Sequence, residues 1–219
     1  MFTGIIQNQA VVLKKIRQGS QIRFVFKLEH PEKRKWSAGE SIAVNGVCLT
    51  AAEIGRKTFA ADVIPETLHS TALSGLEVRS RVNIERSLKM GDPFGGHFVT
   101  GHVDGCGRIV KIQRRGRNRL LTLRAPASIL KLIAPKGSIA VDGISLTVQG
   151  RSGRDFKVAI VPYTLRQTTL ADKKKGDNVN LEVDILTRYL NIFSESMPLS
   201  GKKSRKSLLK IAGLKKQGF

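Results

Sequence analysis

The stretch Ser41-Ile42-Ala43-Val44-Asn45-Gly46 recurs 97 residues later as Ser138-Ile139-Ala140-Val141-Asp142-Gly143. The same spacing relates Thr3-Gly4 to Thr100-Gly101, Leu49-Thr50 to Leu146-Thr147, Pro65 to Pro162, Thr67-Leu68 to Thr164-Leu165, and Val82-Asn83 with Glu85 to Val179-Asn180 with Glu182. A period of this length that occurs only twice differs from the short repeats of solenoid proteins. The chain is therefore predicted to contain a duplicated domain, in which any site has a matched or diverged partner site.

Each copy shows the two-residue period of β-structure. Between residues 21 and 28, Ile22, Phe24, Phe26 and Leu28 alternate with mainly polar residues, as in a half-buried strand. Asn45-Gly46 and Asp142-Gly143 are tight-turn signals, because these residues tolerate positive φ. Further strands are expected near 4–16, 41–44, 47–54, 58–64 and 81–87, and a short helix is expected to begin at Pro65. This pattern predicts an all-β fold: two tandem six-stranded Greek-key β-barrels related by internal duplication, plus a C-terminal α-helix.

The residues after Asp184 follow a helical pattern instead. Apolar residues recur at three- and four-residue steps at Ile185, Leu186, Tyr189, Leu190, Ile192, Phe193 and Met197. Asp184 is a candidate N-cap, and Pro198 with Gly201 ends the helix. The helix either packs on a barrel or pairs with the same helix of other subunits, and we favour association. The expected units are an N-terminal barrel over 1–97, a C-terminal barrel over 98–184, a trimerisation helix over 185–198 and a basic flexible tail over 199–219.

Composition narrows the class of protein. The 219 residues are 41% hydrophobic and 25% charged, as in globular proteins. The formal net charge of +21 suits a nucleic-acid binder. However, the basic runs lie in turns and in the tail, and they lack the interleaved aromatic residues of single-strand binders. We therefore favour solvated basic loops and regard nucleic-acid binding as the weaker alternative.

The expected location is cytoplasmic. Cys48 and Cys106 occupy non-equivalent points of the two copies and do not suggest a disulfide framework, which favours a reducing compartment. The residues from Met1 to Gln7 lack a basic start and a sustained apolar run, so no secretory signal is visible. No segment approaches the roughly 18 apolar residues of a membrane span.

Reactive groups are expected where the copies differ. Cys48 stands opposite Ser145, Ile5 opposite His102, and Ser87 opposite Asp184. Cys48 follows a tight turn, where its thiolate could react, although a cysteine is also often a small buried hydrophobe.

Other chemical signatures are weak. His97 and His102 lie five residues apart without a Cys/His cluster, so no metal site is predicted. A lone histidine in a glycine-rich link is not by itself catalytic, and Gly95-Gly96 lacks the context of a nucleotide loop. The residues alone predict two barrels with paired polar ligand sites and leave the chemistry open.

Several motifs together resemble the riboflavin synthase alpha-chain family of tandem lumazine-binding barrels. They are Met1-Phe2-Thr3-Gly4-Ile5, Asn45-Gly46-Val47-Cys48-Leu49-Thr50, Pro65-Glu66-Thr67-Leu68, Gly95-Gly96-His97, Gly101-His102-Val103-Asp104-Gly105, Asp142-Gly143-Ile144-Ser145-Leu146-Thr147 and Val179-Asn180-Leu181-Glu182-Val183-Asp184. The likeness covers about residues 1 to 197, in order and at the family's spacing.

The resemblance implies a homotrimeric transferase that acts on 6,7-dimethyl-8-ribityllumazine. One molecule donates a four-carbon unit to another, which yields riboflavin and 5-amino-6-ribitylamino-uracil, without a cofactor or metal. The site would lie between the N-terminal barrel of one subunit and the C-terminal barrel of its neighbour. Association with lumazine synthase is left open. The strongest alternative from another class is a non-catalytic lumazine- or flavin-binding optical protein on the same barrels.

The resemblance also implies the site residues. The first pocket would use Gly4, Ile5, Ile6, Cys48, Leu49, Thr50, Asp62 and Thr67, and the second Gly101, His102, Val103, Lys136, Ser145, Thr147, Val161 and Thr164. Further substrate contacts are expected from Phe2, Thr3, Val63, Ile64, Pro65, Glu66, Leu146, Pro162, Tyr163, Leu165 and Arg166. Cys48 and Ser41 would act near the acceptor ring, His102 with Thr147 would move protons at the 7-methyl group, and Asp184 is a further catalytic candidate. Tyr163 departs from the family pattern, where a glutamate is usual.

Overall fold

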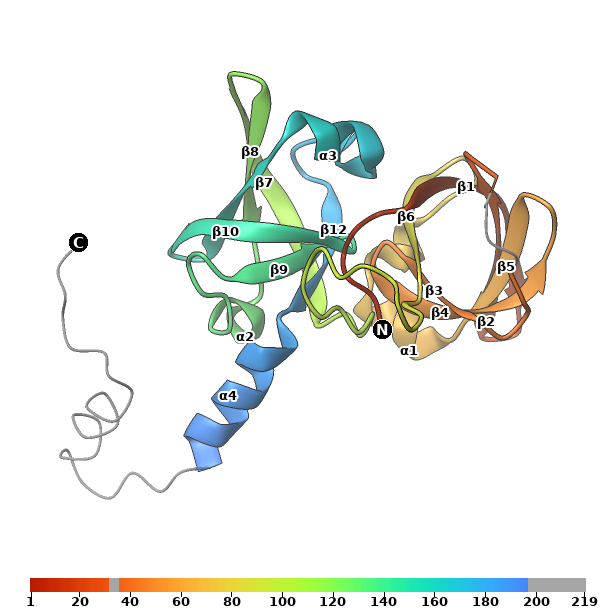
Figure 1. The fold of residues 1–219 in the computed structure, drawn as a ribbon, viewed down its shortest axis with the longest axis horizontal. Coiled ribbons are helices and arrows are strands. Elements are labelled where there is room, and N and C mark those ends of the chain that lie inside the picture. Colours follow the sequence, from red (N-terminus) through yellow and green to blue (C-terminus); the bar gives the residue numbers. More distant parts are fainter. Residues whose placement is uncertain (32–35, 197–219) are drawn as a thin grey trace, which may run out of the picture.

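The computed structural model describes residues 1–31 and 36–196, which form two closed β-barrels side by side (Figure 1). The first barrel contains β1 (Asn8–Gln18), β2 (Gln21–Leu28), β3 (Ser41–Val44), β4 (Val47–Ile54), β5 (Thr58–Val63) and β6 (Arg81–Arg86). The second contains β7 (Gly105–Arg115), β8 (Asn118–Arg124), β9 (Ser138–Val141), β10 (Ile144–Ser152), β11 (Asp155–Ile160) and β12 (Asn178–Val183). The predicted fold of two six-stranded barrels and a C-terminal helix is confirmed.

The two barrels repeat each other in detail. The first closes in the order β1-β2-β5-β4-β3-β6, and the second follows the same order with β7 in the place of β1. The break in register between Val12 and Lys14 on β1 returns between Ile109 and Lys111 on β7. The predicted tight turns are confirmed, because the residue pairs 45–46 and 142–143 have φ angles of 46° and 77° in both copies.

A pseudo-twofold junction joins the barrels through these two turns. A Cβ atom on Gly46 would lie 2.6 Å from the Gly143 nitrogen, so the two glycine backbones are in direct contact. Asn83 Nδ2 donates to the Asp142 carbonyl over 3.0 Å, and Asn180 Nδ2 donates to the Asn45 carbonyl over 2.9 Å. Both asparagines are buried, so these hydrogen bonds satisfy polar groups that would otherwise be costly.

A short segment precedes the first strand of each barrel and lies at the junction. We call residues 2–6 and 99–103 the first and second lead-in segments. They run antiparallel, with hydrogen bonds in both directions between Phe2 and Val99 at 2.7 and 3.1 Å. The strand expected near 4–16 begins only at Asn8, because Phe2 and Gly4 form backbone hydrogen bonds with Val99 and Ser145, and backbone pairing with β6 starts only at Gln7 and Asn8.

Helical elements connect and flank the strands. Proline begins α1 (Pro65–Ser70) and α3 (Pro162–Gln167), as the sequence predicted for Pro65. The short elements η1 (Ala72–Gly75), η2 (Thr169–Ala171) and α2 (Ala127–Leu130) fill the remaining connections.

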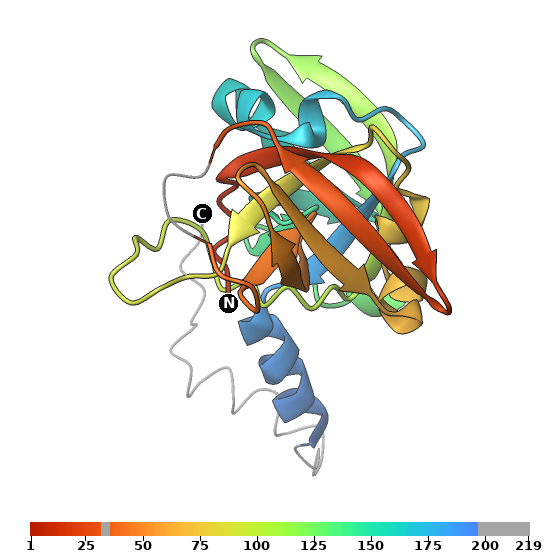
Figure 2. The same ribbon diagram turned by 90° about the vertical axis from the view of Figure 1, so that its right-hand side faces the viewer.

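The last helix, α4 (Ile185–Ser196), projects away from both barrels, as the two views in Figures 1 and 2 show. Asp184 caps it, because Oδ1 accepts the Leu186 N–H over 3.0 Å. The apolar side chains of Leu186, Tyr189, Leu190, Ile192 and Phe193 are each more than half exposed. The tail expected over 199–219 lies outside the described residues. In the part of the chain that the structure describes, none of the helices is long and apolar enough to cross a membrane.

Candidate functional site

The reactive side chains that differ between the copies lie on the outer faces of the barrels. Leu49 on β4 points into the first core, so Cys48 and Thr50 alternate to the outside. On β10, Ser145 and Thr147 occupy the same outward positions. A ligand can therefore approach these groups without entering either core.

The first half-site consists of Cys48, Thr50, Asp62, Gly101 and His102. The Cys48 N–H donates to the Gly101 carbonyl over 2.9 Å. Gly101 has φ of +83°, and a Cβ atom there would lie 2.5 Å from Cys48 Cβ, so only glycine allows this approach. His102 follows Gly101 directly and is exposed, so its backbone lies next to the residue that contacts Cys48.

The second half-site consists of Ser145, Thr147, Gly4, Ile5 and His97. The Ser145 N–H donates to the Gly4 carbonyl over 2.8 Å, and a Cβ atom on Gly4 would lie 2.7 Å from Ser145 Cβ. His97 Nδ1 lies 2.7 Å from Ser145 Oγ. A serine hydroxyl at this distance from an imidazole is the arrangement of a nucleophile with its general base.

The environment of His97 keeps its imidazole neutral. The residue is 7% exposed, and its Nε2 atom has no hydrogen-bond partner among the described residues. Burial lowers the pKa of His97, and the nearby Asp184 carboxylate only partly opposes this effect. A neutral ring can accept the Ser145 proton at Nδ1 while its own proton stays on Nε2.

The structure reverses the predicted assignment of the lead-in segments. The resemblance predicts that Gly4 to Ile6 belong to the first pocket and that Gly101 to Val103 belong to the second. Instead, Ile6 packs against the second core and Val103 against the first. His102 is therefore grouped with Cys48, and not with Thr147. The reason is that each segment crosses the junction before its own barrel begins.

Asp62 is held by a residue that the sequence did not indicate. Arg23 Nε and Nη2 each donate to an Asp62 oxygen over 2.7 Å, and Nη1 donates to Glu53 over 2.6 Å. The hydrogen bond from Arg23 lowers the pKa of Asp62, which keeps the carboxylate ionised as an acceptor for hydroxyl groups. Arg23 and Asp62 face each other across β2 and β5, whereas the equivalent pair is Leu120 and Ala159.

The remaining predicted residues fall into three groups. Exposed positions on and around the turns after β5 and β11 are Ile64, Pro65, Glu66, Val161, Tyr163 and Arg166. Partly buried positions are Ser41, Thr67, Pro162, Thr164, Leu165 and Asp184. Buried positions are Phe2, Thr3, Leu49, Val63 and Leu146. Because the side chains of this last group fill the cores and the junction, they can reach a ligand only through their backbone.

Lys136 has an unusual backbone conformation. Its φ is +66°, and its equivalent is Gly39, with φ of +91°. Holding a lysine in this region costs about 1 kcal/mol. This strain supports the prediction that the exposed Lys136 side chain has a role at the second half-site.

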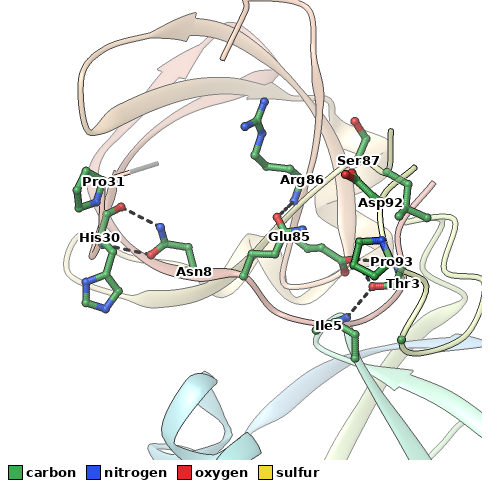
Figure 3. Close-up of a pocket in the computed structure, with 13 residues that line it drawn as sticks. Thr3, Ile5, Asn8, His30, Pro31, Glu85, Arg86, Ser87, Asp92 and Pro93 are labelled. Carbon is green, nitrogen blue, oxygen red and sulfur yellow. Dashed lines mark hydrogen bonds between the residues drawn. The ribbon is translucent and has the colours of Figure 1, made fainter. Parts of the chain in front are cut away.

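A cavity of about 680 Å³ lies beside the first lead-in segment (Figure 3). Thr3 and Ile5 line it together with Glu85 and with Asp92 and Pro93 of the link between the barrels. Cys48 and Ser145 are not among its lining residues. Over the described residues, no group of three or more His, Cys, Asp or Glu side chains could hold a metal ion.

Comparison with known proteins gives the family. The model of the lumazine binding domain matches residues 3–87 and again 100–184. Riboflavin synthase from Photobacterium phosphoreum is 37% identical over 100% of this chain and 99% of its own length. Riboflavin synthase from Actinobacillus pleuropneumoniae is 40% identical over 97% of this chain and 100% of its own length. The chain belongs to the riboflavin synthase family.

Solved structures agree with the riboflavin synthase fold. LumP bound to riboflavin superposes with a TM-score of 0.77 over 84% of this chain and 99% of LumP. LumP bound to 6,7-dimethyl-8-(1'-D-ribityl) lumazine gives a TM-score of 0.75. The sequence identities of 23% and 22% limit this likeness to the fold.

Sequence comparison of the two copies missed His97 because no residue of the first copy aligns with it. The only available signal was its place in Gly95-Gly96-His97. Gly96 is tightly held there, since a Cβ atom on it would overlap the Thr3 carbonyl. A glycine pair that permits close backbone approach is therefore the feature that could have marked His97 as a site residue.

Proposed function

We propose that this chain catalyses the dismutation of 6,7-dimethyl-8-ribityllumazine. Two substrate molecules bind, one donates a four-carbon unit to the other, and the products are riboflavin and 5-amino-6-ribitylamino-uracil. The observation that carries this proposal is the pair of matched but chemically different half-sites. A reaction between two copies of one substrate needs two similar binding surfaces with different reactive groups.

The described contacts support a role for each group. The Cys48 thiol and the Ser145 hydroxyl are the candidate nucleophiles, each with a histidine in its half-site. Asp62 and Thr50 offer oxygen atoms that suit the hydroxyl groups of a ribityl chain. Holding two substrates in the reacting orientation can itself supply roughly 7–11 kcal/mol of the barrier.

The proposal places each complete site between two subunits of a homotrimer. A single chain carries His102 in its first half-site and Thr147 in its second, so the predicted proton-transfer pair forms where two chains meet. The exposed apolar side chains of α4 are suited to hold such an assembly, because water contact with them is unfavourable. The unpaired Cys48 and Cys106 fit a reducing compartment such as the cytoplasm. Association with lumazine synthase stays a prediction.

The direct test supplies purified protein with 6,7-dimethyl-8-ribityllumazine alone, without metal or cofactor, and follows riboflavin absorbance. One riboflavin should form for every two lumazine molecules consumed. His102→Gln should lower kcat about 100-fold, and Cys48→Ser about 10-fold. Cys106→Ser is the matched control, because this cysteine lies on β7, and it should keep the full rate. Tight lumazine binding without turnover would favour a non-catalytic optical protein.

Co-expression of two inactive variants tests the shared site. Cys48→Ala inactivates the first half-site, and Ser145→Ala inactivates the second. In mixed trimers, about a quarter of the sites would combine two intact half-sites and recover activity. Recovery in the mixture supports a site between subunits, and a mixture as inactive as its parents would place the complete site within one chain.

A further inference from the structure

Two buried glutamates hold the lead-in segments in place. Glu85 on β6 is 2% exposed and accepts three hydrogen bonds. Its Oε1 accepts from the Thr3 N–H at 2.7 Å and the Thr3 hydroxyl at 2.8 Å, and its Oε2 accepts from the Gly4 N–H at 3.0 Å. Figure 3 shows this carboxylate beside Thr3, whose hydroxyl in turn accepts the Ile5 N–H.

Glu182 on β12 repeats the arrangement in the second copy. It is 3% exposed and accepts from the Thr100 N–H and hydroxyl, both at 2.6 Å, and from the Gly101 N–H at 3.0 Å. The Thr100 hydroxyl accepts the His102 N–H over 3.2 Å. Each glutamate thus sets the course of three consecutive residues of one lead-in segment.

The segments so held contact the opposite barrel. Glu85 belongs to the first barrel, but the Gly4 carbonyl that it helps to place accepts the Ser145 N–H of the second. Glu182 belongs to the second barrel, and the Gly101 carbonyl accepts the Cys48 N–H of the first. A shift of either segment must move the backbone next to the reactive side chain, because the glycine contacts leave no spare room.

We propose that Glu85 and Glu182 are positioning residues that act across the barrel boundary, Glu85 on the half-site of Ser145 and Glu182 on the half-site of Cys48. The proposal deepens the proposed function and rests on it for the roles of those two residues. A carboxylate suits this task because both its oxygens accept hydrogen bonds. A glutamine would turn one oxygen into an NH₂ donor that faces the N–H of the segment and leaves it unsatisfied.

The test measures thiol reactivity at each half-site in the full chain, and not turnover. Cys106→Ser removes the second native cysteine, so that Cys48 reports on the first half-site. A matched protein with Cys48→Ser, Cys106→Ser and Ser145→Cys reports on the second. Each is combined in turn with Glu85→Gln and Glu182→Gln, and the second-order rate of alkylation by iodoacetamide is measured.

A crossed pattern is expected. Glu182→Gln should change the Cys48 rate at least about fivefold, the factor that one lost hydrogen bond gives, whereas Glu85→Gln should change it less than about twofold. For the thiol at position 145, Glu85→Gln should have the large effect on the alkylation rate and Glu182→Gln the small one. Equal effects on both reporters, or a larger effect within the glutamate's own barrel, would overturn the proposal.

Threonine variants keep the test decisive if a glutamine variant does not fold. Thr3→Val and Thr100→Val remove the hydroxyl contact to each glutamate and the hydrogen bond that the hydroxyl accepts from Ile5 or His102, but they keep the backbone hydrogen bonds to the glutamate. They should give the same crossed pattern with smaller changes. Thr3→Ser and Thr100→Ser keep the hydroxyl group and should therefore keep the alkylation rates of the unchanged residues. Because no step requires riboflavin formation, a failure here is distinguishable from a failure of the proposed reaction, which the lumazine assay measures separately.

Discussion

The two half-sites share a scaffold but differ in the candidate nucleophile and in the histidine that accompanies it. The first combines a thiol with the exposed His102, and the second combines a hydroxyl with the buried His97. The first adds the ionised Asp62 with its Arg23 partner, where the second has Ala159 and Leu120. In contrast, the junction glycines and the two glutamates are the same in both copies. The duplication thus preserved the residues that place the lead-in segments and changed those that face a ligand.

The strongest way to break this shared scaffold is a methyl group at the junction. Gly46→Ala places a Cβ atom 2.6 Å from the Gly143 nitrogen at a φ of +77°. We expect a loss of at least about 3 kcal/mol in the free energy of unfolding, from overlap and backbone strain together. Urea denaturation measures this loss in the free energy of unfolding.

Gly19→Ala is the matched control for this variant. Gly19 also has positive φ, at +61°, but an added Cβ atom would meet nothing within 4 Å. Its expected cost is only about 1 kcal/mol, from the backbone alone. Equal losses in the two variants would show that the contact between the glycines contributes nothing.

A second experiment sharpens the contrast between the two histidines. His97→Gln should lower kcat about 10-fold, because Ser145 loses its basic partner. Stability should also change with pH. Because burial lowers the pKa of His97 in the folded protein, the unfolded chain binds the proton more tightly. As pH falls from 7 through the ordinary imidazole range, this residue therefore lowers the free energy of unfolding.

Unfolding curves at several pH values measure that effect. The variant should lose the part of the pH slope that His97 contributes. His102→Gln serves as the comparison, since it makes the same change of imidazole to amide at an exposed position. A slope that is unaltered in His97→Gln would contradict the neutral, buried imidazole.

The smallest effect is expected from the ion pair that only the first half-site has. Arg23→Met leaves Asp62 without its bidentate partner, so its pKa should rise and its orientation should loosen. We expect KM for lumazine to increase about threefold with kcat nearly unchanged, as for a lost binding contact. Arg124→Met removes a similar cross-strand pair with Asp155 on the second barrel and should leave KM as it is.

The sequence comparison predicted the elements well for a physical reason. Three kinds of feature depend only on a few adjacent residues. They are the turns at Asn45-Gly46 and Asp142-Gly143, the proline at the start of α1 and the Asp184 cap of α4. The side chains of Cys48 and Ser145 could be found because they differ at equivalent positions. His97 and Arg23 could not, since the first has no equivalent and the second acts through a strand partner 39 residues away.

The amino-acid sequence by itself determined the duplication, the strands and turns within each copy and the positions at which the chemistry diverged. Local turn geometry and alternating hydrophobicity specify these features without reference to the rest of the chain. Only the tertiary structure decided which histidine accompanies which nucleophile. That choice depends on the lead-in segments crossing at a glycine-lined junction, where the Cys48 N–H donates to the Gly101 carbonyl and the Ser145 N–H donates to the Gly4 carbonyl. Such contacts arise from packing between the barrels, so a comparison of one copy with the other cannot show them.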